Sequence, residues 1–179
     1  MKKLLILIPL AILLCFTLSC QDKEAMAEFE EMKAQAEVEA QNKELVRQIY
    51  EAIDEKDFDK LQELSASDAV CHIPGVPEEV PYEAVTQVIQ SFYKAFPDST
   101  HVIQDMIAEG DKVAVRFIQD GTHSDEYEGI PPTGNKIKLE GIHLHRIIEG
   151  KITETWLVED NLGMMMQLGM ELKPKKAEK

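Results

Sequence analysis

The sequence predicts an α+β fold in which helices come first and an antiparallel sheet follows them. Apolar residues recur at three- and four-residue spacing in the first half of the chain, and four segments rich in β-branched residues, separated by turn residues, fill the second half. The length of 179 residues and the composition, 44% hydrophobic and 29% charged, fit one globular domain.

The first nineteen residues are predicted to be a signal peptide. Lys2 and Lys3 precede an apolar run over residues 4–18, which is shorter than the roughly 20 residues that a membrane-spanning helix needs. The run ends at Ser19-Cys20, and a small residue directly before cysteine resembles the lipobox of bacterial lipoproteins. We therefore expect a lipidated Cys20 that anchors the mature protein to a membrane of the bacterial cell envelope, facing the periplasm or the exterior. An ordinary cleaved secretion signal is the alternative.

The net charge argues against a nucleic-acid partner, and the cysteine content argues against a disulfide within the mature chain. The formal net charge of −14 would repel phosphate backbones, so no nucleic-acid partner is expected. If Cys15 leaves with the leader and Cys20 carries lipid, only Cys71 remains, and no disulfide can form within the mature chain. Cys71 is predicted to be a small buried apolar residue rather than a nucleophile.

Residues 20–41 are predicted to form a lipid-anchored helical stalk, because they are strong helix formers with a thin apolar stripe. The globular domain is assigned to residues 42–171, and residues 172–179 form a basic tail. Asn42 is the predicted N-cap if a new helix starts there. The apolar residues of that first domain helix are Leu45, Val46, Ile49, Tyr50 and Ile53.

The remaining elements follow from the same patterns. A short second helix around Leu61 and a brief strand at residues 70–73 precede a proline-rich loop, and a third helix ends at Pro97. A last helix begins near Asn161. The strands of the predicted antiparallel meander are residues 100–108, 112–119, 136–148 and 151–159.

The turn at Glu149-Gly150 decides which residues of the last hairpin share a face. A two-residue type I′ turn needs a positive φ at both positions, which glutamate tolerates poorly, whereas a three-residue bulged loop needs it only at the glycine. We therefore predict the bulged loop. One face is then largely apolar and is predicted to face the core, while the other suits solvent or a subunit interface. The predicted inner residues are Ile142, Leu144, Arg146, Ile148, Ile152, Glu154, Trp156, Val158 and Asp160, and the outer ones are His143, His145, Ile147, Lys151, Thr153, Thr155, Leu157 and Glu159.

Three charged residues fall on the predicted inner face. Arg146 and Glu154 are diagonal neighbours, and a structural cross-strand ion pair is the favoured interpretation. Asp160 directly precedes the last helix, so it is a candidate both for its N-cap and for a catalytic role, and the two roles are compatible. His143-x-His145 has the spacing of a metal chelate, but this register turns both histidines away from the acids, so no metal is expected.

Several short segments occur in an order and spacing that together favour one fold. They are Val46-Arg47-Gln48-Ile49-Tyr50, Ala95-Phe96-Pro97-Asp98, Ile107-Ala108-Glu109-Gly110-Asp111, Gly121-Thr122-His123, Gly129-Ile130-Pro131-Pro132-Thr133-Gly134, and Glu154 with Trp156. On these segments, residues from about 42 to 170 resemble the SnoaL-like polyketide cyclase, or ester cyclase, family of the nuclear transport factor two-like superfamily.

The resemblance implies a curved antiparallel sheet packed with the N-terminal helices into a cone with a deep, mainly apolar internal pocket. It also implies a homodimer through the outer sheet face and no metal or organic cofactor. Characterised cyclases of this kind close a ring by intramolecular aldol condensation, with an aspartate as general acid/base. Asp160 and His72 match a family aspartate and histidine, whereas Thr155 and Leu157 stand where many members have His and Gly.

The resulting expectation is an envelope lipoprotein that binds a small hydrophobic or carbonyl-bearing molecule, with cofactor-free acid/base catalysis as its candidate activity. Asp160, His72 and Arg146 are the candidate catalytic residues. The residues expected to contact the ligand are Tyr50, Phe117, Glu154 and Trp156. The alternative is a non-catalytic ligand-binding or protein-interaction module, because a fold shared by many functions does not certify one. A carboxylate of Asp160 open to the pocket beside His72 would favour the enzyme, and one that only caps the helix would favour the binding module.

Overall fold

The computed structural model describes residues 4–171 and residue 173, with side chains from residue 23 onward. The predicted signal peptide, the lipidation site at Cys20 and most of the basic tail therefore lie outside the residues whose side chains are described. By its internal contacts the chain divides into two units, Met1–Val38 and Glu39–Lys179. Among the residues that the structure describes, no helix has both the length and the apolarity needed to cross a membrane.

The first helix, α1, runs without interruption over Leu4–Glu55. Asn42 therefore does not cap a new helix. Its side chain is buried, and its Nδ2 donates a hydrogen bond to the carbonyl oxygen of Gly110 at 3.0 Å, which fixes the helix to the turn between two strands. The last turns of α1 bury Val46, Ile49 and Tyr50 against the sheet, as their spacing predicts.

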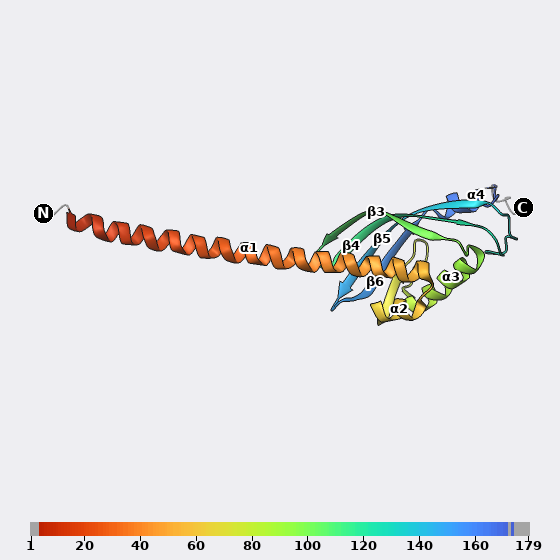
Figure 1. Cartoon of the computed structure of the whole chain (residues 1–179), viewed down its shortest axis with the longest axis horizontal. Coiled ribbons are helices and arrows are strands. Elements are labelled where there is room, and N and C mark those ends of the chain that lie inside the picture. The colour runs from red at the N-terminus through yellow and green to blue at the C-terminus, as the bar shows by residue number, and fades with distance from the viewer. Residues whose placement is uncertain (1–3, 172, 174–179) are drawn as a thin grey trace, which may run out of the picture. The chain divides into compact units, whose positions relative to one another are not determined.

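Six strands form one mixed sheet in the order β2-β1-β6-β5-β4-β3. The strands are β1 Ser65–His72, β2 Val80–Pro81, β3 Thr100–Glu109, β4 Lys112–Thr122, β5 Lys136–Ile148 and β6 Lys151–Glu159. Strands β3 to β6 are the predicted antiparallel meander (Figure 1). Strand β1 pairs with β6 in parallel, since no hairpin links the two and fixes an antiparallel direction. The α+β fold class is confirmed.

Three further helices complete the domain: α2 Phe58–Leu64, α3 Tyr82–Ala95 and α4 Asn161–Gln167. Figure 1 shows α2 and α3 on the same side of the sheet. One hydrophobic core joins α1 and α2 to strands β4, β5 and β6 around Leu61 and Phe117, and a second joins α3 and α4 to β5 around Phe96 and Met164. Residues of both cores, Ile49 of the first and Phe92 and Leu139 of the second, also line the cavity described below.

The turn of the last hairpin differs from the prediction. Glu149 and Gly150 have φ of 51° and 73°, and Ile148 pairs with Lys151, so the turn has two residues and the predicted three-residue loop is wrong. The extra residue lies in β6 instead, where Thr153 interrupts the register between the pair Ile147–Ile152 and the pair Arg146–Glu154. The remaining pairs, Leu144–Trp156 and Ile142–Val158, share a face as predicted.

The orientation of that face is opposite to the prediction. His145 and Thr155 are 3% and 2% exposed and face the helices, whereas Ile142 and Val158 are 52% and 57% exposed on the outer side. Apolar residues alone do not identify the face that packs against the helices, because both faces of the hairpin carry them. Ile147 and Ile152 fill the core on the same face as His145. Buried histidines are tolerated there because each has a hydrogen-bond partner.

Candidate active site

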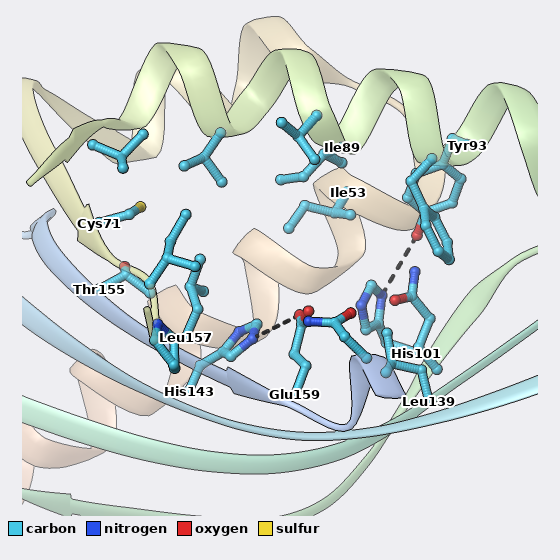
Figure 2. A pocket seen from close by; sticks show the side chains of 18 of the residues that line it. Ile53, Cys71, Ile89, Tyr93, His101, Leu139, His143, Thr155, Leu157 and Glu159 are labelled. Carbon is cyan, nitrogen blue, oxygen red and sulfur yellow. Dashed lines mark hydrogen bonds and ion pairs between the residues drawn. The ribbon is translucent and has the colours of Figure 1, made fainter. Parts of the chain in front are cut away.

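A cavity of about 690 Å³ lies between α3, the end of α1 and the inner face of the sheet. Figure 2 shows Ile89 of α3 and Ile53 of α1 above the cavity, with His143, Leu157 and Glu159 pointing toward them from the sheet. Most of the wall is apolar. Its apolar side chains include Ile49, Ile53, Ile73, Val80, Val85, Val88, Ile89, Phe92, Leu139, Leu157, Leu162 and Met165. A cavity of this size and polarity suits a small, largely apolar molecule.

A chain of three polar side chains crosses the cavity wall. The Tyr50 hydroxyl lies 2.9 Å from Nδ1 of His143, and Nε2 of His143 lies 3.1 Å from Oε1 of Glu159. Helix α1 supplies the tyrosine, β5 the histidine and β6 the glutamate, so three elements fix the chain. Figure 2 shows the His143–Glu159 contact at the centre of the cavity floor.

The protons of this chain follow from its electrostatics. Burial acts to raise the pKa of Glu159, but the hydrogen bond from His143, together with a hydrogen bond from Asn161, outweighs burial and holds that pKa below its usual value. Glu159 is therefore a carboxylate that accepts from Nε2–H of His143. Burial raises the pKa of Tyr50 well above its usual value, so its hydroxyl stays protonated and donates to Nδ1 of His143.

His145 provides a hydrogen-bonding atom that no described residue satisfies. Its Nδ1 lies 3.0 Å from the hydroxyl of Thr155, and its buried Nε2 has no hydrogen-bond partner among the described residues. Desolvation by burial, with the nearby His143 adding to it, lowers the pKa of His145 to about 3, so the ring is neutral. The cavity wall thus contains a neutral imidazole that the contact with Thr155 holds in place.

A second polar cluster borders the same cavity, which its members His101 and Tyr93 line. Nδ1 of His101 is 2.6 Å from Oδ1 of Asp54, the His101 backbone N–H donates to Oδ2 at 2.9 Å, and the Tyr93 hydroxyl donates to Oδ1 at 2.7 Å. Burial acts to raise the pKa of Asp54, but the hydrogen bonds from His101 and Tyr93 outweigh burial and lower it. Asp54 is therefore a carboxylate that orients the imidazole of His101.

Phe117, predicted to contact the ligand, supports the site from behind. It is fully buried in the core, and its ring contacts the rings of Tyr50, His101 and His143 at centroid distances of 5.4, 5.2 and 4.6 Å. It lies opposite Gly141 on the neighbouring strand, where a Cβ would stand 2.4 Å from Cζ of Phe117. The absence of a side chain at Gly141 therefore makes room for the ring that positions three polar residues.

Four other predicted site residues lie together, but on the outer face of the sheet. Nε2 of His72 is 3.3 Å from Oε1 of Glu154, and Arg146 forms an ion pair with the same carboxylate. The His72 ring stacks on Trp156 at 4.7 Å, and the Arg146 guanidinium lies 5.5 Å from the centre of the Trp156 ring. None of the four lines the cavity of about 690 Å³. The cross-strand ion pair is present, with Arg146 and Glu154 directly opposite rather than diagonal.

Asp160 lies at the rim of the cavity and caps α4. Its Oδ1 accepts a hydrogen bond from the backbone N–H of Gly163 at 2.8 Å, and the residue is exposed. A Cβ on Gly163 would stand 2.1 Å from Oδ2 of Asp160, so the cap requires glycine there. His72 lies on the other face of the sheet, and the structure does not bring the two residues together. An Asp160 that caps the helix and does not lie beside His72 is the arrangement expected of a non-catalytic binding module.

Two further groups bear on thiol reactivity and metal binding. Cys71 lines the cavity, and burial raises the pKa of its thiol to about 12, which leaves it unreactive at neutral pH. Within the described part of the chain, the one group of three metal-ligating side chains whose ligand atoms lie within 4.8 Å of one another is His72, Glu79 and Glu154. Glu154 is already paired with the Arg146 guanidinium, which disfavours a cation there.

Sequence reasoning missed Glu159, Asp54 and His101 as site residues. Strand alternation did place His143, His145 and Glu159 on one face, so the signal for Glu159 was present and only the orientation of the face was missing. Asp54 follows Tyr50 by four residues, one helical turn along the same helix face. No comparable local pattern marks His101.

Comparisons with known proteins agree with this fold. The model of a family described as SnoaL-like polyketide cyclase matches residues 43–168. The chain is similar to aklanonic acid methyl ester cyclase DauD of Streptomyces sp. (strain C5), with 30% identity over 131 residues, which cover 70% of this chain and 80% of that protein.

Solved structures show the same likeness. Wild-type IdmH from Streptomyces antibioticus has 37% sequence identity and a TM-score of 0.64, covering 72% of this chain and 99% of IdmH. AclR from Streptomyces galilaeus has 27% identity and a TM-score of 0.69, covering 73% of this chain and 97% of AclR.

Proposed function

Because the chain belongs to the SnoaL-like polyketide cyclase family, we propose that its cavity binds a small, largely apolar, carbonyl-bearing molecule and transfers protons on it without a cofactor. The observation that carries this proposal is the Glu159 carboxylate, which lies in a mainly apolar cavity and is held by His143 at 3.1 Å. The similar protein DauD is a methyl ester cyclase, which makes ring closure the candidate reaction.

In the proposed reaction Glu159 removes a proton from the carbon next to a carbonyl group. A bound apolar molecule displaces water from the cavity, and the added desolvation acts to raise the basicity of Glu159 from the lowered value of the free protein. His143 donates to the carboxylate and is itself held by Tyr50.

The test uses a simple ketone, because the natural substrate is unknown. Deuterium exchange at the activated carbon of 2-tetralone in D₂O, followed by NMR, measures proton removal directly. Glu159→Gln is expected to slow the protein-catalysed exchange by roughly 10²- to 10⁴-fold. Asp160→Asn, a matched carboxylate-to-amide change at the next residue, compares the two candidates. If the exchange rate falls more in Asp160→Asn than in Glu159→Gln, the assignment of Glu159 is overturned and the catalytic role predicted for Asp160 is restored.

A non-catalytic binding module is the second candidate function, and the capping role of Asp160 favours it. It predicts that wild-type protein binds the ketone but catalyses no exchange above buffer. Binding seen by NMR line broadening, without exchange, would support this candidate against the enzyme.

We also propose that the mature chain is a lipoprotein of the bacterial cell envelope anchored through Cys20. The support is the short apolar run that ends at Ser19-Cys20. Cys20→Ala is expected to release the protein from membranes or to stall its processing. Unchanged membrane retention together with an unchanged N-terminal mass would refute the anchor.

A homodimer through the outer sheet face is the proposed assembly. The support is a row of exposed apolar side chains from three strands: Val102, Ile107, Ile142, Ile148 and Val158, each at least half exposed. A second copy would cover this face, and Ile142→Arg should then shift sedimentation equilibrium toward the monomer. A wild-type chain that stays monomeric at high micromolar concentration would exclude the dimer.

A further inference from the structure

The cluster of Asp54, His101 and Tyr93 has no part in the reaction proposed above. His101 of β3 and Tyr93 of α3 line the same cavity, and Asp54 at the end of α1 lies behind them, whereas His143 and Glu159 belong to β5 and β6. Figure 2 shows His101 and Glu159 pointing toward the same region of the cavity. Tyr50 lies between the two clusters. Its ring is edge-on to that of His101, with the ring centroids 5.0 Å apart, and its hydroxyl forms a hydrogen bond with His143.

Two hydrogen bonds to Asp54 restrain His101, in addition to its packing. Both carboxylate oxygens are used by the same residue, one by the ring Nδ1 and the other by the backbone N–H, so the ring has one orientation. Nδ1 must carry a hydrogen to bond an ionised carboxylate, and this leaves Nε2 available to a bound molecule. A carboxylate at 2.6 Å also stabilises positive charge on the ring when Nε2 takes up a second proton.

The cluster also connects the cavity with a second hollow. A cavity of about 520 Å³ is lined by Tyr50, Asp54 and His101 together with residues of β3, so Tyr50 and His101 stand in the wall between the two spaces. The Asp54 side chain is 22% exposed, whereas that of His101 is 7% exposed. A proton can therefore reach His101 from solvent through the second cavity, while its ring stays in the dry wall of the first.

We propose that His101 is a second catalytic acid, which protonates the oxygen of a second carbonyl group while Glu159 acts as the base. This inference rests on the proposed function and narrows the substrate to a molecule with two carbonyl groups. The C–H bond breaks and its proton passes to Glu159. The electron pair forms the new C–C bond to the second carbonyl carbon, and the C=O π pair moves to oxygen, which takes the Nε2 proton of His101. Glu159 then loses its proton to solvent and His101 regains one, so ring closure leaves the proton count unchanged.

The geometry distinguishes this role from a purely structural clamp. A clamp between α1 and β3 would affect every reaction in the cavity through stability alone. An acid for the second carbonyl is needed only when a C–C bond forms, and simple enolisation does not use it. The two reactions therefore separate the two roles.

The experiment compares two probes in the same variants. Deuterium exchange of 2-tetralone measures enolisation, and conversion of 2,6-heptanedione to 3-hydroxy-3-methylcyclohexanone, counted together with the 3-methylcyclohex-2-enone that it forms by losing water, measures ring closure. His101→Gln is expected to keep exchange within about threefold of wild type and to lower ring closure by 10²-fold or more. Asp54→Asn should lower ring closure less, because the imidazole remains. Thr100→Ala, at the exposed neighbouring position of β3, is the control and should change neither rate.

The outcomes separate the two proposals. If wild-type protein catalyses no exchange, the proposed function fails. If exchange is intact in wild type and His101→Gln lowers both reactions equally, or lowers neither, the role of His101 is refuted. Thermal unfolding of each variant is measured alongside. Should His101→Gln fail to fold, Asp54→Asn decides: a loss of ring closure with exchange intact supports the acid, and an equal loss of both refutes it.

Discussion

The neutral state of His145 makes the stability of the protein depend on pH. Its folded-state pKa is lowered from 6.5 to about 3, chiefly by desolvation. Below pH 6.5 the unfolded chain therefore binds a proton at His145 that the folded chain rejects, and the free energy of unfolding decreases. The decrease continues as the pH falls and stops near pH 3, where the folded protein also takes up the proton.

The loss of unfolding free energy between pH 7 and pH 5 depends only on how far His145 takes up a proton in the unfolded chain, since its imidazole stays neutral in the folded protein over that range. One pKa unit corresponds to about 1.4 kcal/mol, so the loss between these two pH values is about 2 kcal/mol. His145→Gln removes the titrating group and keeps a polar side chain near Thr155. The variant should lose about 2 kcal/mol less than wild type over this interval.

Urea denaturation at pH 7 and pH 5 measures the difference, with the fluorescence of the single tryptophan, Trp156, as the signal. Thr155→Val is the matched control. It removes the hydrogen bond to His145 but leaves the imidazole buried, so it should be less stable at both pH values and keep the wild-type pH dependence. If His145→Gln and wild type lose the same free energy between pH 7 and pH 5, the buried neutral imidazole is not the cause.

Three stability predictions follow from backbone geometry. Gly141→Ala places a Cβ 2.4 Å from the Phe117 ring and should cost about 1–3 kcal/mol in urea denaturation, with part of the loss recovered when Phe117→Leu is added. Asp160→Ala should cost about 1 kcal/mol by loss of the cap, and Gly163→Ala should add little to it, because both changes break the same hydrogen bond; full additivity would contradict this. Glu149→Asn should raise the free energy of unfolding by roughly 0.5–1 kcal/mol, since Glu149 has a φ of 51° that asparagine adopts more easily, and a lower free energy of unfolding would refute this reasoning.

The fold was predictable because its signals are local. The spacing of Val46, Ile49 and Tyr50 fixed the helix face that packs on the sheet, and the segments of the meander have clear turn residues between them. The turn at Glu149-Gly150 was not predictable from conformational preference alone. A bulge at Thr153, three residues beyond the turn, supplies the register that the longer loop would have given.

The site was predictable only in part, for a different reason. Alternation along a strand says which residues share a face, and it placed His143 and His145 with Glu159. It does not say which face the helices cover when both faces carry apolar residues. The partners that make burial of the histidines acceptable, Tyr50 above all, come from a helix 93 residues away in sequence. Only the three-dimensional arrangement shows that the carboxylate bonded to His143 in the cavity wall is Glu159, one position before the predicted Asp160.

The bulge at Thr153 has a consequence for which side chains of the last hairpin line the cavity. It is the single position where the two strands of the last hairpin differ in residue count, and every later residue of β6 takes its direction from it. If the bulge were lost by pairing Thr153 with Arg146, every later residue of β6 would move by one position, which would turn Thr155, Leu157 and Glu159 outward and bring Glu154 and Trp156 inward. A change in strand pairing outside the cavity would thus replace the chemistry of its wall, while every side chain in the hairpin stayed the same.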